Sequence, residues 1–302
     1  MEKELCGVIL VNKHKGVTSH DIVFKIRRLY NTKKVGHTGT LDPLATGVLP
    51  VLVGRAAKAA EYLLSENKEY IARIKLGITT DTEDITGKIL TKSDTLPTKN
   101  EFFESCARFV GEIDQVPPMY SALKVNGEKL VDLARKGIEI ERQARKINIY
   151  SIEPCVINEE MGEYEIKVAC SKGTYIRTLC ADIGAYLGCG ATMTELQRTK
   201  SGPFEINDAH TILSLEELDF DARCSLLMPV EDLFKEAKEV ILPDFYSRLC
   251  KSGCEIYQKK IKTNFDTDTF VRISDKNGFF ALGQVKEYPE GSAIKAIKLF
   301  VI

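Results

Sequence analysis

The sequence GHTGTLDPLATGVLP, residues 36–50, is the stretch that decides the fold of this chain. Residues 35–54 around it hold four glycines and two prolines, too many for the interior of a helix. The stretch has neither the Gly-Lys-Ser/Thr of a phosphate-binding loop nor the Gly-x-Gly-x-x-Gly of a dinucleotide fingerprint, so a nucleotide cradle is not expected. Asp42 lies between Leu41 and Pro43, on a stiff backbone that has no N–H at the proline. This setting suits a positioned nucleophile or base, and an ordinary Asp-Pro surface turn is the alternative.

Hydrophobic spacing on both sides of this stretch predicts strands and helices. An apolar run at 7–11 predicts a buried strand, and Ser19 is expected to cap the helix that follows. Alternation of apolar and polar residues predicts strands at 70–76, 147–157 and 164–170. Thr174 is expected to cap a second helix that stops near Gly188. Asn277-Gly278 between two alternating runs predicts a hairpin. We therefore expect a large α/β domain and a small β-rich domain with a boundary near Glu239.

Length and composition place the chain among globular proteins. It has 302 residues, of which 44% are hydrophobic and 28% charged, so two domains are expected and wholesale disorder is excluded. Nine cysteines form no Cys-x-x-Cys pair, which favours reduced thiols in a cytoplasmic protein. No apolar run approaches the roughly 18 residues that a bilayer span needs, so a soluble protein is expected.

The net charge of −1 hides an uneven distribution. Residues 1–60 hold ten basic and four acidic side chains, whereas residues 205–239 hold three basic and ten acidic ones. The first region could face phosphates and the second would repel them. Two ordinary solvated helix faces are the alternative.

The stretch 36–50 resembles the active-site motif of the TruB family of pseudouridine synthases over all fifteen residues. The resemblance continues through residues 11–19, 70, 80–87, 117–124, 172–177 and 196–204. It implies an α/β (α+β) pseudouridine synthase fold, in which helices flank a central mixed, mainly antiparallel sheet. Residues 1–238 would form the catalytic domain, with an excursion at about 125–146 that closes over RNA. Residues 239–302 loosely resemble a small β-rich PUA-type RNA-binding domain.

The resemblance implies catalytic roles for Asp42, Tyr70 and Arg177. The family reaction breaks the N1–C1′ bond of uridine, turns the uracil and rejoins it through C5, so no cofactor is expected. Asp42 matches the catalytic aspartate, Tyr70 the tyrosine that stacks on the uracil, and Arg177 the arginine that pairs with the carboxylate. Independently of the family, a cation in the first turn of a helix calls for an anionic partner, because the helix dipole disfavours it there. Tyr70 as a plain core residue, and Arg177 paired with Asp182 or another acid, are the alternatives.

Six further residues are expected to form the substrate site, and four more cations are expected beside them as phosphate contacts. His37 resembles the family histidine that fills the space left by the flipped base, and Leu196 the leucine that packs under the base. A loop histidine and a core leucine are the alternatives. The cations interpreted as phosphate contacts are Lys13, Lys172, Arg145 and Arg198, together with Lys15, Arg142, Lys146 and Lys200. The remaining histidines form no evident metal set, so no metal is expected.

Together the residues and the resemblance predict an enzyme that isomerises uridine 55 in the T-loop of tRNA, without cofactor or guide RNA. The T-arm of tRNA is the expected partner of a monomer with no obligate protein partner and no membrane contact. Two alternatives stay open, a non-catalytic tRNA-binding or folding module and a guide-dependent synthase. The chain departs from the family pattern at His14, Val131, Gln143 and Gln197, which lie in the first turn, the closing excursion and the strand that carries Leu196.

Overall fold

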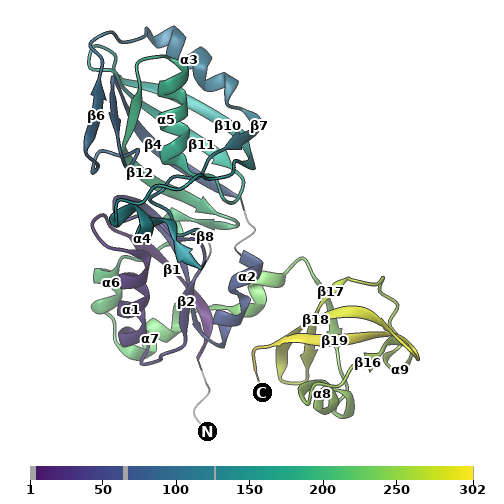
Figure 1. Cartoon of the computed structure of the whole chain (residues 1–302). Coiled ribbons are helices and arrows are strands. Elements are labelled where there is room, and N and C mark those ends of the chain that lie inside the picture. The colour runs from purple at the N-terminus through teal and green to yellow at the C-terminus, as the bar shows by residue number, and fades with distance from the viewer. Residues whose placement is uncertain (1–4, 64–66, 126, 302) are drawn as a thin grey trace.

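The chain is built around a mixed sheet of ten strands, described here by a computed structural model that covers residues 5–63, 67–125 and 127–301 (Figure 1). The strands of this sheet are β1 (Cys6–Lys13), β2 (Val35–His37), β3 (Thr46–Gly54), β4 (Lys68–Leu76), β7 (Gly111–Gln115), β10 (Arg145–Asn158), β11 (Glu163–Cys170), β12 (Ala191–Ser201), β13 (Phe204–Glu205) and β14 (Met228–Pro229). Their order is β14-β1-β3-β12-β4-β11-β10-β7, with β2 beside β3 and β13 beside β12. All pairs are antiparallel except β3 and β12, which confirms the predicted mixed, mainly antiparallel sheet.

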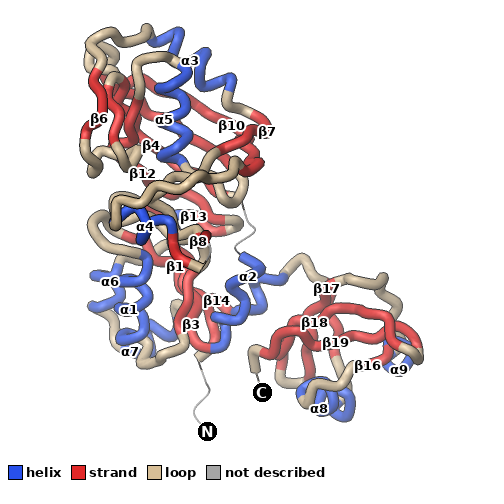
Figure 2. The backbone as a smooth tube through the Cα atoms, viewed as in Figure 1, coloured by secondary structure: helices blue, strands red, loops and turns tan. Residues whose placement is uncertain are grey.

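Helices lie on this sheet and beside it, and the last two helices of the described residues lie against a second, smaller sheet (Figure 2). They are α1 (Ser19–Leu29), η1 (Arg55–Ala59), α2 (Ala60–Leu63), α3 (Lys99–Arg108), α4 (Leu130–Arg135), α5 (Ile176–Tyr186), η2 (Ile206–Asp208), α6 (Ile212–Glu216), α7 (Phe220–Ser225), η3 (Val230–Phe234), α8 (Asp244–Lys251) and α9 (Gln258–Ile261). In the described part of the chain, none of them has the length and apolar character that a membrane crossing would require.

One half of the sheet, β12-β4-β11-β10-β7, is covered on a single face. The alternating residues of β4 and β11 that point to this face are buried against α5 and α3, where Phe102 stacks on Tyr164 at 4.1 Å between ring centroids. The opposite face carries charged pairs, such as Arg73 with Glu165. This one-sided burial explains the alternating pattern in the sequence.

The other half, β1 and β3, is buried on both faces. Val11 and Val51 pack against α1 on one side, and Leu10 and Leu52 pack with Phe300 on the other. A strand covered on both faces reads as a continuous apolar run, as observed at residues 7–11.

The cap of α1 is shifted by one residue from the prediction. Thr18, rather than Ser19, is the N-cap: its hydroxyl accepts the N–H of Asp21, and the Asp21 carboxylate accepts the N–H of Thr18. Ser19 is left free for a different contact, described below.

A second, five-stranded sheet follows, in the order β15-β17-β18-β19-β16. Its strands are β15 (Lys238–Ile241), β16 (Ile256–Tyr257), β17 (Phe270–Asp275), β18 (Gly278–Tyr288) and β19 (Gly291–Leu299). The hairpin predicted at 277–278 is confirmed, since Asp275 pairs with Gly278, whose φ is +101°. The sheet begins at Lys238, but the division of the chain into domains at 238/239 stays a prediction.

Two small hairpins complete the described structure. They consist of β5 (Ile78–Thr80) with β6 (Ile89–Lys92), and of β8 (Lys124–Val125) with β9 (Glu128–Lys129). The second hairpin and α4 belong to the predicted excursion. Here Met119, Leu130 and Leu133 form a small apolar cluster of their own, separate from the main core.

Candidate active site

Asp42 lies on the loop between β2 and β3, and this loop is anchored on both sides of the carboxylate. Leu41 and Leu44 are buried, which fixes the backbone around Asp42. The buried hydroxyl of Ser19 on α1 accepts the N–H of Leu41 at 2.8 Å and donates to its carbonyl at 3.1 Å. Sequence analysis assigned Ser19 to a helix cap and missed this role.

Gly47 lets the end of the loop pass close to β12. Its φ is +107°, and a Cβ at this position would lie 2.2 Å from the carbonyl oxygen of Arg198. No other residue type fits such an approach with an unstrained backbone. Gly47 therefore allows the parallel pairing of β3 with β12.

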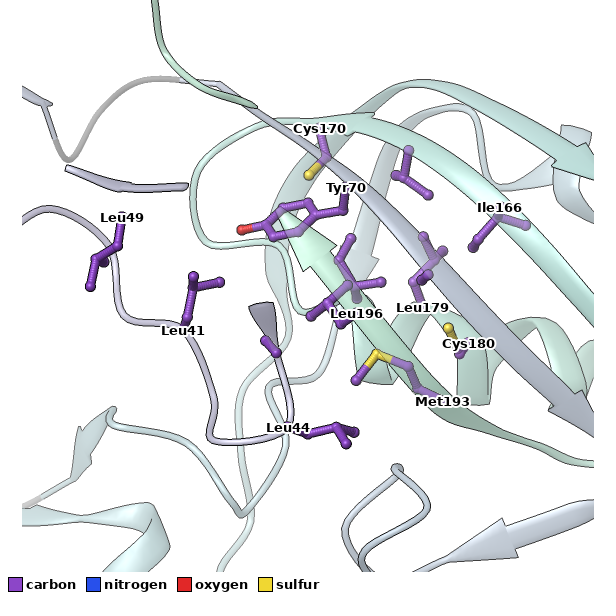
Figure 3. Close-up of a cluster of buried hydrophobic side chains, with 14 of the residues drawn as sticks. Leu41, Leu44, Leu49, Tyr70, Ile166, Cys170, Leu179, Cys180, Met193 and Leu196 are labelled. Atoms are coloured by element: carbon purple, nitrogen blue, oxygen red, sulfur yellow. The ribbon is translucent and has the colours of Figure 1, made fainter. Parts of the chain in front are cut away.

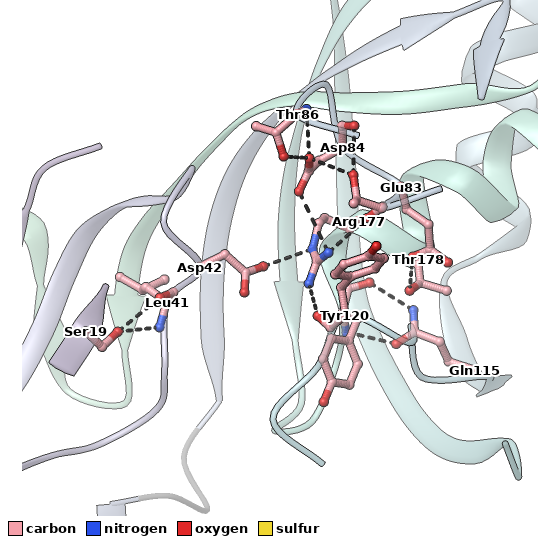
Figure 4. A network of polar contacts seen from close by, with 12 residues as sticks. Ser19, Leu41, Asp42, Glu83, Asp84, Thr86, Gln115, Tyr120, Arg177 and Thr178 are labelled. Carbon is pink, nitrogen blue, oxygen red and sulfur yellow. Dashed lines mark hydrogen bonds and ion pairs between the residues drawn. The ribbon is translucent and has the colours of Figure 1, made fainter. Parts of the chain in front are cut away.

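Arg177 forms an ion pair with Asp42. Its Nε lies 2.9 Å from Asp42 Oδ2, and its side chain is 5% exposed, whereas that of Asp42 is 38% exposed (Figure 4). Arg177 is the second residue of α5, in the first turn as expected, but the N-cap is Tyr175 rather than Thr174. The Thr174 hydroxyl instead donates to the carbonyl of Ser171.

Three further groups hold the Arg177 guanidinium. Nη1 donates to the carbonyl of Thr82 at 2.9 Å, and Nη2 donates to the carbonyl of Tyr120 at 2.8 Å. Asp84 Oδ2 lies 3.8 Å from Nη1, while Asp84 Oδ1 accepts hydrogen bonds from Thr82 and Thr86. Sequence analysis included Asp84 in the resembling turn at 80–87 but gave it no role, since one acid in a polar turn does not indicate its partner.

The electrostatic environment raises the pKa of the Asp42 carboxyl above its ordinary value. Burial is the main cause, the Arg177 charge opposes it, and the nearby Asp84 carboxylate adds to it. Arg177 thus limits a rise that burial would otherwise make larger.

Tyr70 lies on β4 beside this pair. It is 8% exposed, and its ring lies among Leu41, Leu196 and Cys170 (Figure 3). Burial raises the pKa of the phenol, and the charge of Arg198 works against this rise.

These residues line a cleft of about 490 Å³. Six of the nine predicted site residues are among its lining: Asp42, Tyr70, Lys172, Arg177, Leu196 and Arg198. Residues 120–123, Lys129 and Val131 of the segment leading into and through the excursion line it as well, so this segment lies at the cleft.

The placement of Lys13 and Arg198 corrects their interpretation as phosphate contacts. Arg198 is 1% exposed, and it donates to the carbonyls of Val48 and Gly39, which ties the loop that carries Asp42 to β12. Lys13 is fully buried, donates to the carbonyls of His14 and Val17, and has a pKa that burial lowers to about 8. Groups at this depth hold the protein backbone rather than an RNA surface.

His37 and Arg145 lie outside the lining of the cleft. His37 is half-buried at the end of β2, burial lowers its pKa, and its Nδ1 has no hydrogen-bond partner among the described residues. Arg145 is exposed at the start of β10. The described residues contain no cluster of three or more histidine, cysteine or acidic side chains suited to a metal ion.

Comparisons with known proteins agree with this geometry. Residues 27–176 match the model of the TruB family pseudouridylate synthase N-terminal domain, and residues 177–235 match that of the tRNA pseudouridylate synthase B C-terminal domain. A protein of Clostridium tetani named tRNA pseudouridine synthase B is 44% identical over 98% of this chain and 99% of its own length. A protein of the same name from Francisella tularensis subsp. novicida is 42% identical over 96% of this chain and 93% of its own length.

Solved structures give the same fold. A chain in the crystal structure of a Cbf5-Nop10-Gar1 complex superposes with a TM-score of 0.71 at 27% identity, covering 98% of this chain and 85% of that one. A chain of an H/ACA RNP bound to a substrate RNA containing 2′-deoxyuridine gives 0.70 at 26%, with the same coverage. The fold and the site thus define a pseudouridine synthase, an isomerase by its chemistry. Because relatives at 42–44% identity span nearly the whole length, the chain belongs to the TruB family.

Proposed function

We propose that this protein converts uridine 55 in the T-loop of tRNA to pseudouridine, with the Asp42 carboxylate acting on a flipped-out uridine. The observation that carries the proposal is the Asp42–Arg177 ion pair in a cleft that Tyr70 also lines. The tRNA substrate is supported by the relatives named tRNA pseudouridine synthase B. Isomerisation neither oxidises the substrate nor removes a group from it, so the proposal includes no cofactor.

The cleft can take a base out of the RNA. Extruding a base costs a few kcal/mol of stacking. Stacking on the Tyr70 ring would return about 1 to 3 kcal/mol, and Leu196 would pack against the base from β12. The cleft volume of about 490 Å³ is in the range of small-ligand pockets, so a single nucleoside fits this scale.

The ionised form of Asp42 performs the chemistry. Attack on C1′, attack on C6 and removal of the C2′ proton are three first steps that each need a carboxylate rather than a carboxylic acid. Arg177 favours that carboxylate against the effect of burial. It also fixes the orientation of Oδ2, because three other contacts hold the guanidinium in place.

Exposed cations, one in the cleft lining and one outside it, would position the T-arm. Lys172 lines the cleft, and Arg145 stands exposed on β10, where phosphates can reach both. We assign His37 to the space that the flipped base leaves, and residues 125–146 to a segment that closes over the RNA. The enzyme acts as a monomer in the cytoplasm, on bare tRNA without a guide.

The test is an activity assay on an unmodified tRNA transcript, with the product mapped by mass spectrometry. Wild-type protein is expected to yield pseudouridine at position 55 alone, and Asp42→Asn none. Asp221→Asn is the matched control, because it makes the same chemical change at an exposed site on α7. Full activity of Asp42→Asn would refute the catalytic assignment. Binding of tRNA without product would favour a non-catalytic module, and activity only with added guide RNA would favour a guide-dependent synthase.

A further inference from the structure

Gln115 holds the backbone at the start of α5 from outside that helix. It is the last residue of β7 and is 2% exposed. Its Oε1 accepts the N–H of Tyr175 at 2.8 Å, and its Nε2 donates to the carbonyl of Tyr175 at 3.1 Å. Tyr175 is the N-cap residue of α5, and no side chain caps this helix in the usual way. A single buried amide, 60 residues away in sequence, thus bonds both backbone groups of the cap residue, and the carbonyl also accepts the N–H of Leu179 within α5.

The same segment contacts Arg177 a second time. Five residues after Gln115, the carbonyl of Tyr120 accepts the hydrogen bond from Arg177 Nη2. Pro117 and Pro118 lie between these two contacts, and their fixed φ stiffens the chain. Residues 115–120 therefore hold both the backbone from which Arg177 projects and one side of its guanidinium. In Figure 4, Arg177 lies between Asp42 and the group formed by Tyr120 and Gln115.

On the basis of the proposed function, we infer that Gln115 is a positioning residue, which sets Arg177 against Asp42 by clamping the backbone of Tyr175. Gln115 is not in the lining of the cleft, so it acts through Arg177 and not on the RNA. Loss of the clamp would leave the partly buried N–H of Tyr175 without this partner, while its carbonyl would keep only the hydrogen bond from the Leu179 N–H at 3.0 Å. The backbone at the start of α5 would shift to satisfy the N–H. A displacement of about 1 Å at a reacting group can lower a rate about 100-fold.

A competing explanation is that the clamp serves the excursion. The segment continues into Ser121, whose carbonyl accepts the N–H of Val131, and into Leu123, whose carbonyl accepts the N–H of Leu130. If the clamp mattered mainly there, its loss would weaken RNA binding and leave the rate at saturating RNA unchanged. Rate and affinity measured separately distinguish the two explanations.

Gln115→Met removes both hydrogen bonds at nearly constant side-chain volume. The chain offers a control in Gln258, which is 3% exposed and clamps the backbone of Phe265, with Oε1 accepting its N–H at 2.7 Å and Nε2 donating to its carbonyl at 2.9 Å. The Gln258 amide also bonds the hydroxyls of Ser292 and Thr263, so Gln258→Met removes more hydrogen bonds than Gln115→Met does. Gln258 begins α9 in the C-terminal part of the chain, and α9 lies away from α5 (Figure 1). Each change is made alone and together with Arg177→Lys. The measurements are the single-turnover rate at saturating unmodified tRNA, the RNA affinity and the melting temperature.

We expect Gln115→Met to lower the saturating rate about 10- to 100-fold, with the RNA affinity changed less than about threefold. In the Arg177→Lys background the same change should cost less than about threefold, because the pair is already misplaced and the two effects are not additive. Gln258→Met is expected to lower the melting temperature by at least as much and to leave the rate within about twofold in both backgrounds. Gln115→Asn keeps the amide on a shorter side chain, so an intermediate rate is expected.

Any of three results would overturn the inference while the wild type is active. Gln115→Met and Gln258→Met could have equal rates, or Gln115→Met could lower the rate as much in the Arg177→Lys background as in the wild type. In the third, Gln115→Met would weaken RNA affinity and leave the saturating rate unchanged. If Gln115→Met does not fold, a wild-type rate for Gln115→Asn overturns it. A wild type that makes no pseudouridine would overturn the proposed function, and this inference with it.

Discussion

Replacing Asp84 by Asn tests how the two carboxylates share Arg177. Asp84 is 5% exposed as a residue, and its Oδ2 lies 3.8 Å from Arg177 Nη1, against 2.9 Å between Arg177 Nε and Asp42 Oδ2. At an effective dielectric constant of about 20, these separations correspond to attractions of about 4 and about 6 kcal/mol with the guanidinium. Asp84→Asn removes the weaker attraction and also removes a negative charge that disfavours ionisation of Asp42.

Two effects are therefore expected, one on the pKa of Asp42 and one on the maximal rate. The pKa of Asp42 should fall, because the Asp84 charge helps to raise it, so the acid limb of the pH–rate profile should move to lower pH. The maximal rate should drop about tenfold, since the amide that replaces Oδ2 can turn a donor toward Arg177 and displace it. The hydrogen bonds that Asp84 Oδ1 accepts from Thr82 and Thr86 can be kept by the amide oxygen, so the fold should survive.

The assay is the single-turnover rate at saturating tRNA as a function of pH. Asp81→Asn is the control, because Asp81 is exposed in the same turn and accepts only a backbone N–H from Lys88 among its described contacts. An acid limb that stays in place or moves to higher pH would refute the view that Asp84 opposes ionisation of Asp42. An equal shift for Asp81→Asn would show a general effect of surface charge instead.

Three further predictions follow from the placement of single residues. Tyr70→Phe should keep the RNA affinity within about 1 kcal/mol, because the stacking face of the ring remains, and a large fall in its rate would assign chemistry to the phenol. Tyr70→Ala should weaken RNA binding by about 1 to 3 kcal/mol in a filter-binding assay. Arg145→Ala should lower the slope of log affinity against log salt by about 1. Lys13→Met should leave that slope unchanged, because Lys13 is fully buried. A slope lowered by both changes would contradict the assignment of Lys13 to the protein backbone. Burial opposes ionisation of Asp275, but hydrogen bonds led by that of Lys251 outweigh it and lower the pKa to about 2. This carboxylate should therefore contribute about 2 kcal/mol of stability above pH 4, lost as the pH falls from about 4 to about 2. Asp275→Asn should remove that part of the acid dependence in urea unfolding, and an unchanged pH profile would contradict it.

Local patterns predicted most of the strands correctly. The alternation of β4 and β11 and the Asn-Gly hairpin before β18 are properties of short segments, and the structure has them where the sequence places them. Helix caps were less predictable. Ser19 and Thr174 were each one residue from the cap observed. At α1 the cap is a local pair of Thr18 with Asp21, whereas at α5 the backbone of Tyr175 is bonded by Gln115 from another element.

The site residues likewise divide into those that the sequence identified and those whose role depended on tertiary contacts. Asp42 and Arg177 could be identified from the resemblance, and the first-turn position of Arg177 indicated an anionic partner. Lys13 and Arg198 were misinterpreted as phosphate contacts, because the sequence does not distinguish a basic side chain that faces solvent from one that bonds buried backbone carbonyls. Burial depends on which other segments of the chain pack over a residue.

The sequence by itself determined the chemistry available to this protein: an aspartate on a stiff loop, a tyrosine at an inward position of a strand, an arginine at a helix start and a glycine with the backbone freedom that close strand packing needs. Only the tertiary structure decided which of these groups meet. Asp84 and Gln115 act on Arg177 through contacts between segments far apart in the chain, and the pKa of Asp42 depends on burial and charges summed over all of them. Such sums depend on distances in space, which no local pattern of residues records.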